Sequence, residues 1–304
     1  MPDRLPVLKT YKLYIGGAFP RTESGRTMPL RVGGAAPEGR IVAHACRASR
    51  KDLRDAVAAA RKAQPAWAAA TGYLRGQILY RLAEMLEGKR PELASLIDAR
   101  ATAEGLPPPV GADPTPRLDG QTEVSLSIDR LVAFAGWADK FASVLGGQNA
   151  VAGPYWNITV PEPVGVVGVV CPAGLPLLGL ITLVAPALCA GNTAVVVSGA
   201  DAAVVSTLGE ACATSDLPGG VINLLTGDPA ELAPVLAAHR DVDALHAAGI
   251  GPDLARSLEA GRADNLKRVI VRRDVPWHDS AACHAPGWLE PLVEFKTVWH
   301  PTGA

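Results

Sequence analysis

The sequence predicts an α/β protein built on a Rossmann-type doubly wound parallel sheet, with a helical segment before it. Short apolar runs alternate with helical patterns between residues 164 and 272, which is typical of parallel strands joined by crossover helices. No charged residue occurs from Val164 to Ala200, and strands covered on both faces give such continuous apolar runs. The expected strands are 164–171, 193–198, 221–225, 242–246 and 267–272, and the expected helices are 177–190, 201–214, 229–238 and 252–262.

The uncharged run exceeds the roughly 20 residues that a membrane helix requires. Pro172, Pro176 and Pro186 divide it, together with several glycines, so we expect a buried strand, a helix and a second strand rather than a membrane span. The formal net charge is −1, with no block rich in lysine or arginine. Neither nucleic acid nor an anionic membrane is therefore an expected partner.

The compartment expected from the sequence is the cytoplasm. The first residues, MPDRLPVLKTYKLYIGG, have no apolar run typical of a secretory signal. Cysteines are odd in number and form no CxxC pair, which favours reduced thiols over a disulfide framework. The five are Cys46, Cys171, Cys189, Cys212 and Cys283.

Residues 1–147 are expected to form strands and helices that pack on the sheet. Short strands are expected in YKLYIGGAFPR, with a turn at Gly16–Gly17, and near residues 40–46. Helices follow, the first beginning at the possible cap Ser49. A proline-rich surface loop is expected from 104 to 123, and one helix from 124 to 145.

Three glycine turns at strand ends are candidates for contacts with a nucleotide phosphate, because backbone N–H groups at such turns bind anions. The turn CPAGLP follows the first strand, Gly227 follows the third and Gly249 follows the fourth. No GxGxxG motif is present. Glycine at strand ends is also what any α/β sheet uses to turn, so spacing alone leaves dinucleotide binding open.

The stretch WHDSAACH gathers His278, Cys283 and His284. A catalytic thiolate needs a nearby base and a lowered pKa, and a zinc site needs about four ligands. A fourth ligand is not evident here, so we expect a loop cysteine and no metal site.

Successive blocks of the chain resemble the aldehyde dehydrogenase superfamily. They are LYIGGAFPRTESGR, DAVAAARKAQPAW, RGQILYRLAEML, PEPVGVVGVVCPAGLPL, APALCAGNTAVVV, SDLPGGVINLLTGDPAEL, DVDALHAAG and NLKRV, in the family's order from about residue 10 to 270. FKTVWHPTG also resembles the final strand of that family. The resemblance implies an aldehyde dehydrogenase-like fold and oxidation of an aldehyde through a cysteine thiolate with NAD(P) as hydride acceptor.

The chemical groups that this resemblance implies are replaced. Gly174, in the corner Pro172–Ala173–Gly174–Leu175–Pro176, stands at the oxyanion asparagine, and Arg272 stands at the general-base glutamate. Val197 stands at the lysine that reaches the cofactor ribose. A NAD or NADP site, if kept, is therefore expected to be weakened or lost. The candidate cofactor contacts are Pro172, Ala173, Gly174, Val197, Gly227 and Gly249, while Ala200 and Ile250 replace two further polar contacts.

The family's catalytic domain is missing between the sheet and the last strand, so the resemblance is to a truncated member that lacks its catalytic domain. The sheet is assigned to 164–273, and only a linker at 274–290 follows, too short for a domain. Both halves of the family's extended oligomerisation arm remain, a ribbon at 148–163 and a C-terminal strand at 291–304. The resemblance implies interface residues Tyr155, Trp156, Phe295 and Trp299.

Three functions remain open. The first is a non-catalytic (pseudoenzyme) subunit that forms a hetero-oligomer with a full-length aldehyde dehydrogenase, because an arm without its docking domain needs a partner. The second is an oxidoreductase that binds NAD(P) and acts on aldehydes, alone or with a shared site. The third is a decayed remnant without a specific role.

Overall fold

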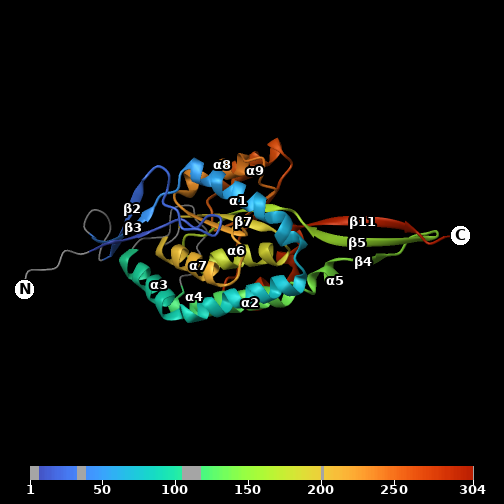
Figure 1. The fold of residues 1–304 in the computed structure, drawn as a ribbon, viewed down its shortest axis with the longest axis horizontal. Coiled ribbons are helices and arrows are strands. Elements are labelled where there is room, and N and C mark those ends of the chain that lie inside the picture. Colours follow the sequence, from blue (N-terminus) through green and yellow to red (C-terminus); the bar gives the residue numbers. More distant parts are fainter. Residues whose placement is uncertain (1–6, 33–38, 105–117, 200–201, 304) are drawn as a thin grey trace, which may run out of the picture.

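The computed structural model describes residues 7–32, 39–104, 118–199 and 202–303. At its centre lies a five-stranded parallel sheet with the order β10-β9-β6-β7-β8 (Figure 1). This confirms the predicted α/β class and the parallel sheet. The strands are β6 (Val166–Val170), β7 (Thr193–Ser198), β8 (Ile222–Thr226), β9 (Ala244–Ala248) and β10 (Arg268–Arg272), and the crossover helices are α6 (Leu178–Cys189), α7 (Ala202–Thr214), α8 (Pro229–Ala238) and α9 (Pro252–Gly261).

Alternate side chains of each strand point into two separate apolar clusters, as the strand pleat requires. Val167 and Val169 belong to a cluster with α6 and α7, against which the helices of residues 72–137 pack. Val166 and Val170 belong to a second cluster with the helix of residues 50–69, α8 and α9. Figure 1 shows these layers on the two faces of the sheet.

The N-terminal helices are α1 (Arg50–Ala69), α2 (Gly72–Gly88), α3 (Arg90–Glu104), α4 (Gly120–Trp137) and α5 (Phe141–Leu145). The predicted cap is confirmed, because the Ser49 side chain accepts from the N–H of Asp52, whose carboxylate accepts from the N–H of Ser49. The helix expected at 124–145 is instead two helices. α4 begins earlier, at an Asp119 cap, and ends at Trp137, and α5 begins at Phe141.

Part of the expected proline-rich loop, residues 105–117, lies outside the described residues.

A small sheet of β1 (Lys9–Tyr11), β2 (Thr27–Val32) and β3 (Arg40–Cys46) has the order β1-β3-β2. The Gly16–Gly17 turn is confirmed, with φ of +62° and +84°. Sequence reasoning missed β2, in which Pro29 interrupts the apolar pattern.

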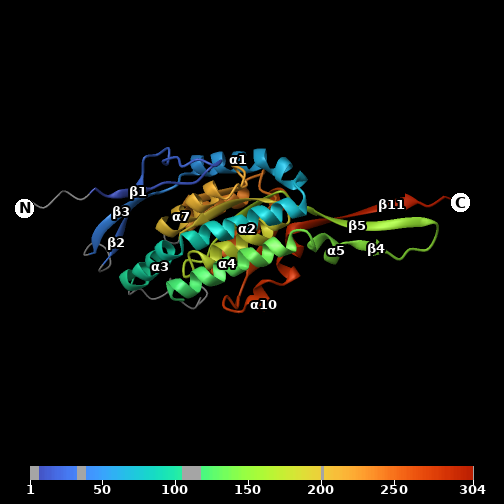
Figure 2. The same ribbon diagram turned by 60° about the horizontal axis from the view of Figure 1, so that its bottom comes forward.

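An arm of three strands projects far from the body, with the C-terminal end at its tip (Figures 1 and 2). It consists of β4 (Gly147–Asn149), β5 (Tyr155–Pro163) and β11 (Val293–Pro301) in the order β11-β5-β4. β5 and β11 pair antiparallel along their whole length, from Val293 opposite Pro163 to Pro301 opposite Tyr155. The ribbon and the C-terminal strand, distant in sequence, thus form one unit.

Residues 274–292, here called the cap segment, fold back against the body. They contain α10 (Ser280–Cys283) and 3-10 helices at Pro286–Trp288 and Glu290–Leu292. Trp277, Trp288 and Leu289 are buried in the cluster that also holds α4 and α6, and Figure 2 shows α10 beside α4. The segment that joins sheet and arm is therefore a packed element.

Among the described residues, no helix has the length and apolarity to cross a bilayer.

Candidate functional site

The candidate cofactor positions gather at one edge of the sheet, because the strands are parallel and their carboxyl ends lie together. Pro172–Gly174 follow β6, and Gly227 and Gly249 directly follow β8 and β9. The Gly227 N–H donates to the Ser198 carbonyl (3.1 Å), which joins two neighbouring strand ends. Gly249 has a φ of +61°, the left-handed region that favours glycine.

The corner after β6 keeps its shape without a donor side chain. Pro172 and Pro176 are buried, Ala173 is half-buried and Gly174 is exposed at the apex. Gly179 at the start of α6 packs so closely on Pro172 that no Cβ would fit there. Gly174, which the sequence resemblance assigns to the oxyanion amide, is thus an exposed residue with no side chain to polarise a carbonyl.

Glu123 occupies the N-terminus of α6. Its Oε1 accepts from the backbone N–H groups of Leu177 (2.8 Å) and Leu178 (3.0 Å), and the side chain is 1% exposed. A helix N-terminus with free N–H groups attracts anions, but here a carboxylate of the same chain occupies it. Sequence reasoning missed Glu123 because contact between α4 and α6 carries no local signal.

Helices α8 and α9 also begin at this edge of the sheet, and their N-caps differ. At α8, Asp228 accepts from the N–H of Ala230 (2.9 Å). At α9, the cap residue is Gly251 and no side chain caps the helix. The described starts of α6 and α8 are therefore occupied by carboxylates. The start of α9 has no side-chain cap and lies beside the glycine turn at Gly249.

Val197, which the sequence resemblance assigns to the ribose-binding lysine, is fully buried in the cluster that contains α1 and α8. It contributes apolar packing to that cluster and has no polar group for a ribose. Ile250 is half-buried, and Ala200 lies outside the described residues. The edge therefore offers backbone donors near α9 for the pyrophosphate of a dinucleotide, and an apolar side chain at the lysine position.

Arg272 points inward and holds the cap segment. Its Nε donates to His246 Nε2 (3.0 Å), a terminal nitrogen donates to the Gly287 carbonyl (3.1 Å), and the guanidinium lies 4.0 Å from the Trp288 ring centroid. His246 is fully buried with Nδ1 3.0 Å from the Leu183 carbonyl. Burial, and then the Arg272 charge, lowers the His246 pKa to about 3, so the ring is neutral and Nε2 accepts. A cation that is fixed in this way cannot replace a general base.

A second arginine, which is fully buried, anchors the same segment. Arg130 of α4 is fully buried and donates to the Trp277 carbonyl (2.6 Å). Burial lowers its pKa to about 10, which leaves the guanidinium charged at neutral pH. On the same side, the Trp137 indole donates to the His284 carbonyl (2.8 Å). The cap segment is thus tied to α4 and to the end of β10.

The thiols lie in apolar surroundings. Cys283 ends α10 rather than lying in the loop expected, is fully buried, and its Sγ is 3.4 Å from the Pro276 carbonyl. Burial raises the pKa of Cys171 far above its ordinary value and those of Cys189 and Cys212 to about 12. The thiolate forms that a nucleophile requires are therefore suppressed at Cys171, Cys189 and Cys212. Within the described ranges, no three His, Cys, Asp or Glu side chains form a metal-binding group.

The four candidate interface residues are all exposed on the arm, but they divide between its two faces. Since successive strand residues alternate, the register places Tyr155, Phe295 and Trp299 on one face and Trp156 on the other. Their exposed fractions run from 44% to 58%. Trp156 shares its face with further exposed apolar side chains, namely Ile158, Val160 and Val298.

The sheet with helices on both faces and glycine turns at its carboxyl edge defines a Rossmann-type α/β protein that carries a strand arm. The sequence model of the aldehyde dehydrogenase family matches residues 34–272. The chain belongs to the aldehyde dehydrogenase family, which confirms the resemblance drawn from its sequence blocks.

Known relatives give the extent of the likeness. The chain is 33% identical over 275 residues to the mitochondrial benzaldehyde dehydrogenase of Antirrhinum majus, covering 89% of this chain and 48% of the relative. It is 31% identical to cytosolic aldehyde dehydrogenase 1 of Elephantulus edwardii, covering 93% and 54%. The crystal structure of PnpE from Pseudomonas sp. WBC-3 superimposes with a TM-score of 0.75 at 28% identity, covering 88% and 51%. The chain spans about half the length of the curated relatives it matches.

Proposed function

We propose that this chain is a non-catalytic subunit that associates through its arm with a full-length aldehyde dehydrogenase. The observation that carries the proposal is the complete β5–β11 pairing of the arm. It adjoins the short cap segment, where the family resemblance leads us to expect a whole domain. The chain thus keeps the element that joins subunits in the family and lacks the part onto which that element would dock. A partner that has this part supplies the missing surface.

The arm has the physical character of an unfinished interface. The outer edge of β11 pairs with no strand of the described chain, and an open edge with exposed apolar side chains is prone to pair with another strand. Trp156, Val298 and Trp299 are each more than half exposed. Aromatic side chains of this kind dominate binding energy at protein interfaces, so we expect them to be buried in the complex.

The chemistry supports a role without catalysis. The family's donor and base positions hold Gly174 and Arg272, the first without a side chain and the second fixed by His246. Cys283 is fully buried at the end of α10. Acyl transfer needs a nucleophile, a base and an oxyanion donor together. We infer that this chain supplies none of them.

The test is co-expression of the tagged chain with an untagged full-length aldehyde dehydrogenase, followed by affinity purification. We expect the two to co-purify, and the double variant Trp156→Glu/Trp299→Glu to lose the partner. Val7→Glu is the matched control, since Val7 is an apolar residue 90% exposed and shortly precedes β1, in the small sheet at the end of the molecule opposite the arm (Figure 2). Equal recovery of the partner by the wild type and the arm variant would refute docking through the arm.

A second candidate function is an aldehyde-oxidising protein that still binds NAD(P). It is favoured by the uncapped start of α9 beside Gly249, and a 28% identical relative, PnpE, has been solved in complex with nicotinamide adenine dinucleotide. Bound at this edge, the cofactor would supply hydride acceptance, and backbone N–H groups near Gly251 would hold its pyrophosphate. Calorimetric titration with NAD and NADP tests this, and we expect binding weaker than about 1 mM, because Val197 cannot hold the ribose.

We place the association in the cytoplasm, since all five cysteines are free and buried, which suits a reducing compartment. A chain that binds neither a full-length relative nor a nicotinamide cofactor would support the third possibility, a decayed remnant. The co-expression experiment and the cofactor titration together separate the three functions.

A further inference from the structure

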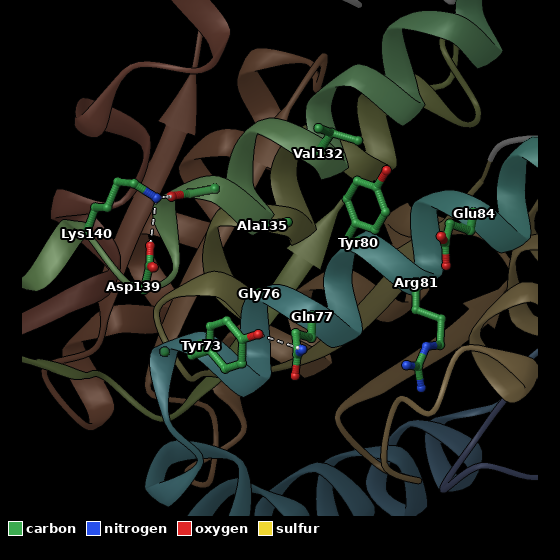
Figure 3. Close-up of a pocket in the computed structure, with 12 residues that line it drawn as sticks. Tyr73, Gly76, Gln77, Tyr80, Arg81, Glu84, Val132, Ala135, Asp139 and Lys140 are labelled. Carbon is green, nitrogen blue, oxygen red and sulfur yellow. Dashed lines mark hydrogen bonds and ion pairs between the residues drawn. The ribbon is translucent and has the colours of Figure 1, made fainter.

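A groove runs between α2 and α4, on the side of the body that carries the N-terminal helices (Figure 3). Its volume is about 520 Å³. Tyr73, Gln77, Tyr80 and Glu84 line it from α2, and Val132 and Gly136 line it from α4. None of these residues belongs to the carboxyl edge of the sheet or to the arm.

The floor of the groove is rigid because the two helices touch. A Cβ on Gly76 would lie 2.7 Å from the Ala135 carbonyl oxygen, and one on Gly72 would collide with the Ala138 carbonyl. Close packing of this kind cannot deform cheaply. The groove is therefore a preformed surface, which lowers the entropy that binding costs.

Two tyrosines form ridges along the groove. Tyr73 is 66% exposed and Tyr80 is 51% exposed, and seven helical residues separate them by about 10 Å along the axis. A polyproline II helix repeats every three residues, about 9 Å. Prolines on two successive turns of such a helix would therefore contact the two rings.

Among the described residues of the groove, the charged side chain without an ion pair is a carboxylate. Arg81 pairs with Asp216, and Lys140 contacts Asp139 (2.8 Å) and the Gly136 carbonyl (2.6 Å). Glu84 has no ion pair within the part of the chain that the structure describes. One turn of helix from Tyr80, it is placed to receive a cation that lies at the end of the groove.

We propose that this groove binds a proline-rich segment of a partner protein, in polyproline II conformation, with prolines on Tyr73 and Tyr80 and an arginine at Glu84. Aromatic-lined grooves are the usual recognition surface for such segments. Gln77 Nε2 donates to the Tyr73 hydroxyl (3.0 Å), so the phenolic hydrogen stays available for a ligand carbonyl. Polyproline II carbonyls have no internal partner and need such donors.

The inference is independent of the arm and of the cofactor edge. It is tested by calorimetric titration of the purified chain with the peptide acetyl-Arg-Ala-Pro-Pro-Leu-Pro-Pro-amide. We expect saturable binding tighter than about 1 mM. Tyr80→Ala should weaken it at least roughly tenfold, and Glu84→Gln roughly threefold to fivefold. Glu259→Gln, an exposed site on α9, should leave it unchanged.

A charge exchange makes the test decisive. A peptide with glutamate in place of arginine should bind more weakly to the wild type and should regain affinity for Glu84→Arg. Circular dichroism checks that each variant is folded, and both sites are on the exposed face of α2. No saturation by the peptide, or binding that Tyr80→Ala and the charge exchange leave unaltered, would overturn the proposal.

Discussion

The Nε of Arg272 lies 3.0 Å from Nε2 of a fully buried His246. The residue that the family resemblance places at the general base thus ends the last sheet strand with a cation that faces the protein interior. The cation also stacks on Trp288, so the cap segment is fastened to the carboxyl end of β10. The contacts of Arg272 therefore anchor residues 274–292 to the sheet.

Restoring the carboxylate should not restore function. Arg272→Glu replaces a cation by an anion beside His246 and removes the stacking on Trp288. We expect the free energy of unfolding to fall by about 2–4 kcal/mol and no aldehyde oxidation to appear. Urea denaturation measures the first effect. Arg273→Glu, at the exposed next residue, is the control, and an equal loss in both variants would contradict the role of Arg272 as an anchor.

Glu123 should stabilise the start of α6. Glu123→Ala leaves the N–H groups of Leu177 and Leu178 buried without acceptors, which we expect to cost about 2–3 kcal/mol. Glu123→Gln keeps an oxygen acceptor and loses only the charge, so a loss of about 1 kcal/mol is expected. Thermal unfolding ranks the two variants. If both variants unfold at the same temperature as the wild type, the capping by Glu123 does not contribute to the stability of the fold.

Stability should depend on pH through His246. Its pKa is lowered to about 3 in the folded chain and is near 6.5 in an unfolded one. Between these values the unfolded state binds the extra proton, so the free energy of unfolding falls as pH drops, by up to about 1.4 kcal/mol per pH unit. Denaturation of wild type and His246→Gln from pH 7 to 4 should show a shallower slope in the variant. Parallel slopes would exclude His246 as a source of the pH dependence.

The thiols should be unreactive in the folded chain. All five cysteines are buried, and burial raises the pKa values of Cys171, Cys189 and Cys212. A thiol reagent such as dithionitrobenzoate should label none of them rapidly at neutral pH and all five after denaturation. Ser143→Cys, at an exposed site on α5, supplies a positive control. Rapid labelling of any native thiol would argue that a reactive cysteine survives.

The sheet was predictable because its signals are local. Strands such as Thr193–Ser198 are buried on both faces and therefore appear as uncharged runs, and the Ser49 cap follows a known pattern of side chains. The arm could be predicted only from the family resemblance, since residues 155–163 have no local feature that identifies their partner strand.

The missed features depend on contacts between distant elements. The sequence predicts a loop up to Glu123 because of the prolines before it. The role of Glu123 depends on the packing of α4 on α6, which gives its carboxylate two donors. The cap segment has no periodicity, yet Trp277 and Trp288 are buried because Arg130 and Arg272 hold it in place. The groove between α2 and α4 likewise requires the crossing of two helices that the sequence does not fix.

The claim that the chain keeps the arm for a catalytic partner is tested most directly by native mass spectrometry of the chain after co-expression with a full-length aldehyde dehydrogenase. The account predicts a mixed complex whose mass includes at least one 31.5 kDa chain, and Trp156→Glu/Trp299→Glu should abolish it. A chain found only as a stable 31.5 kDa monomer, with the partner assembled without it, would contradict the account.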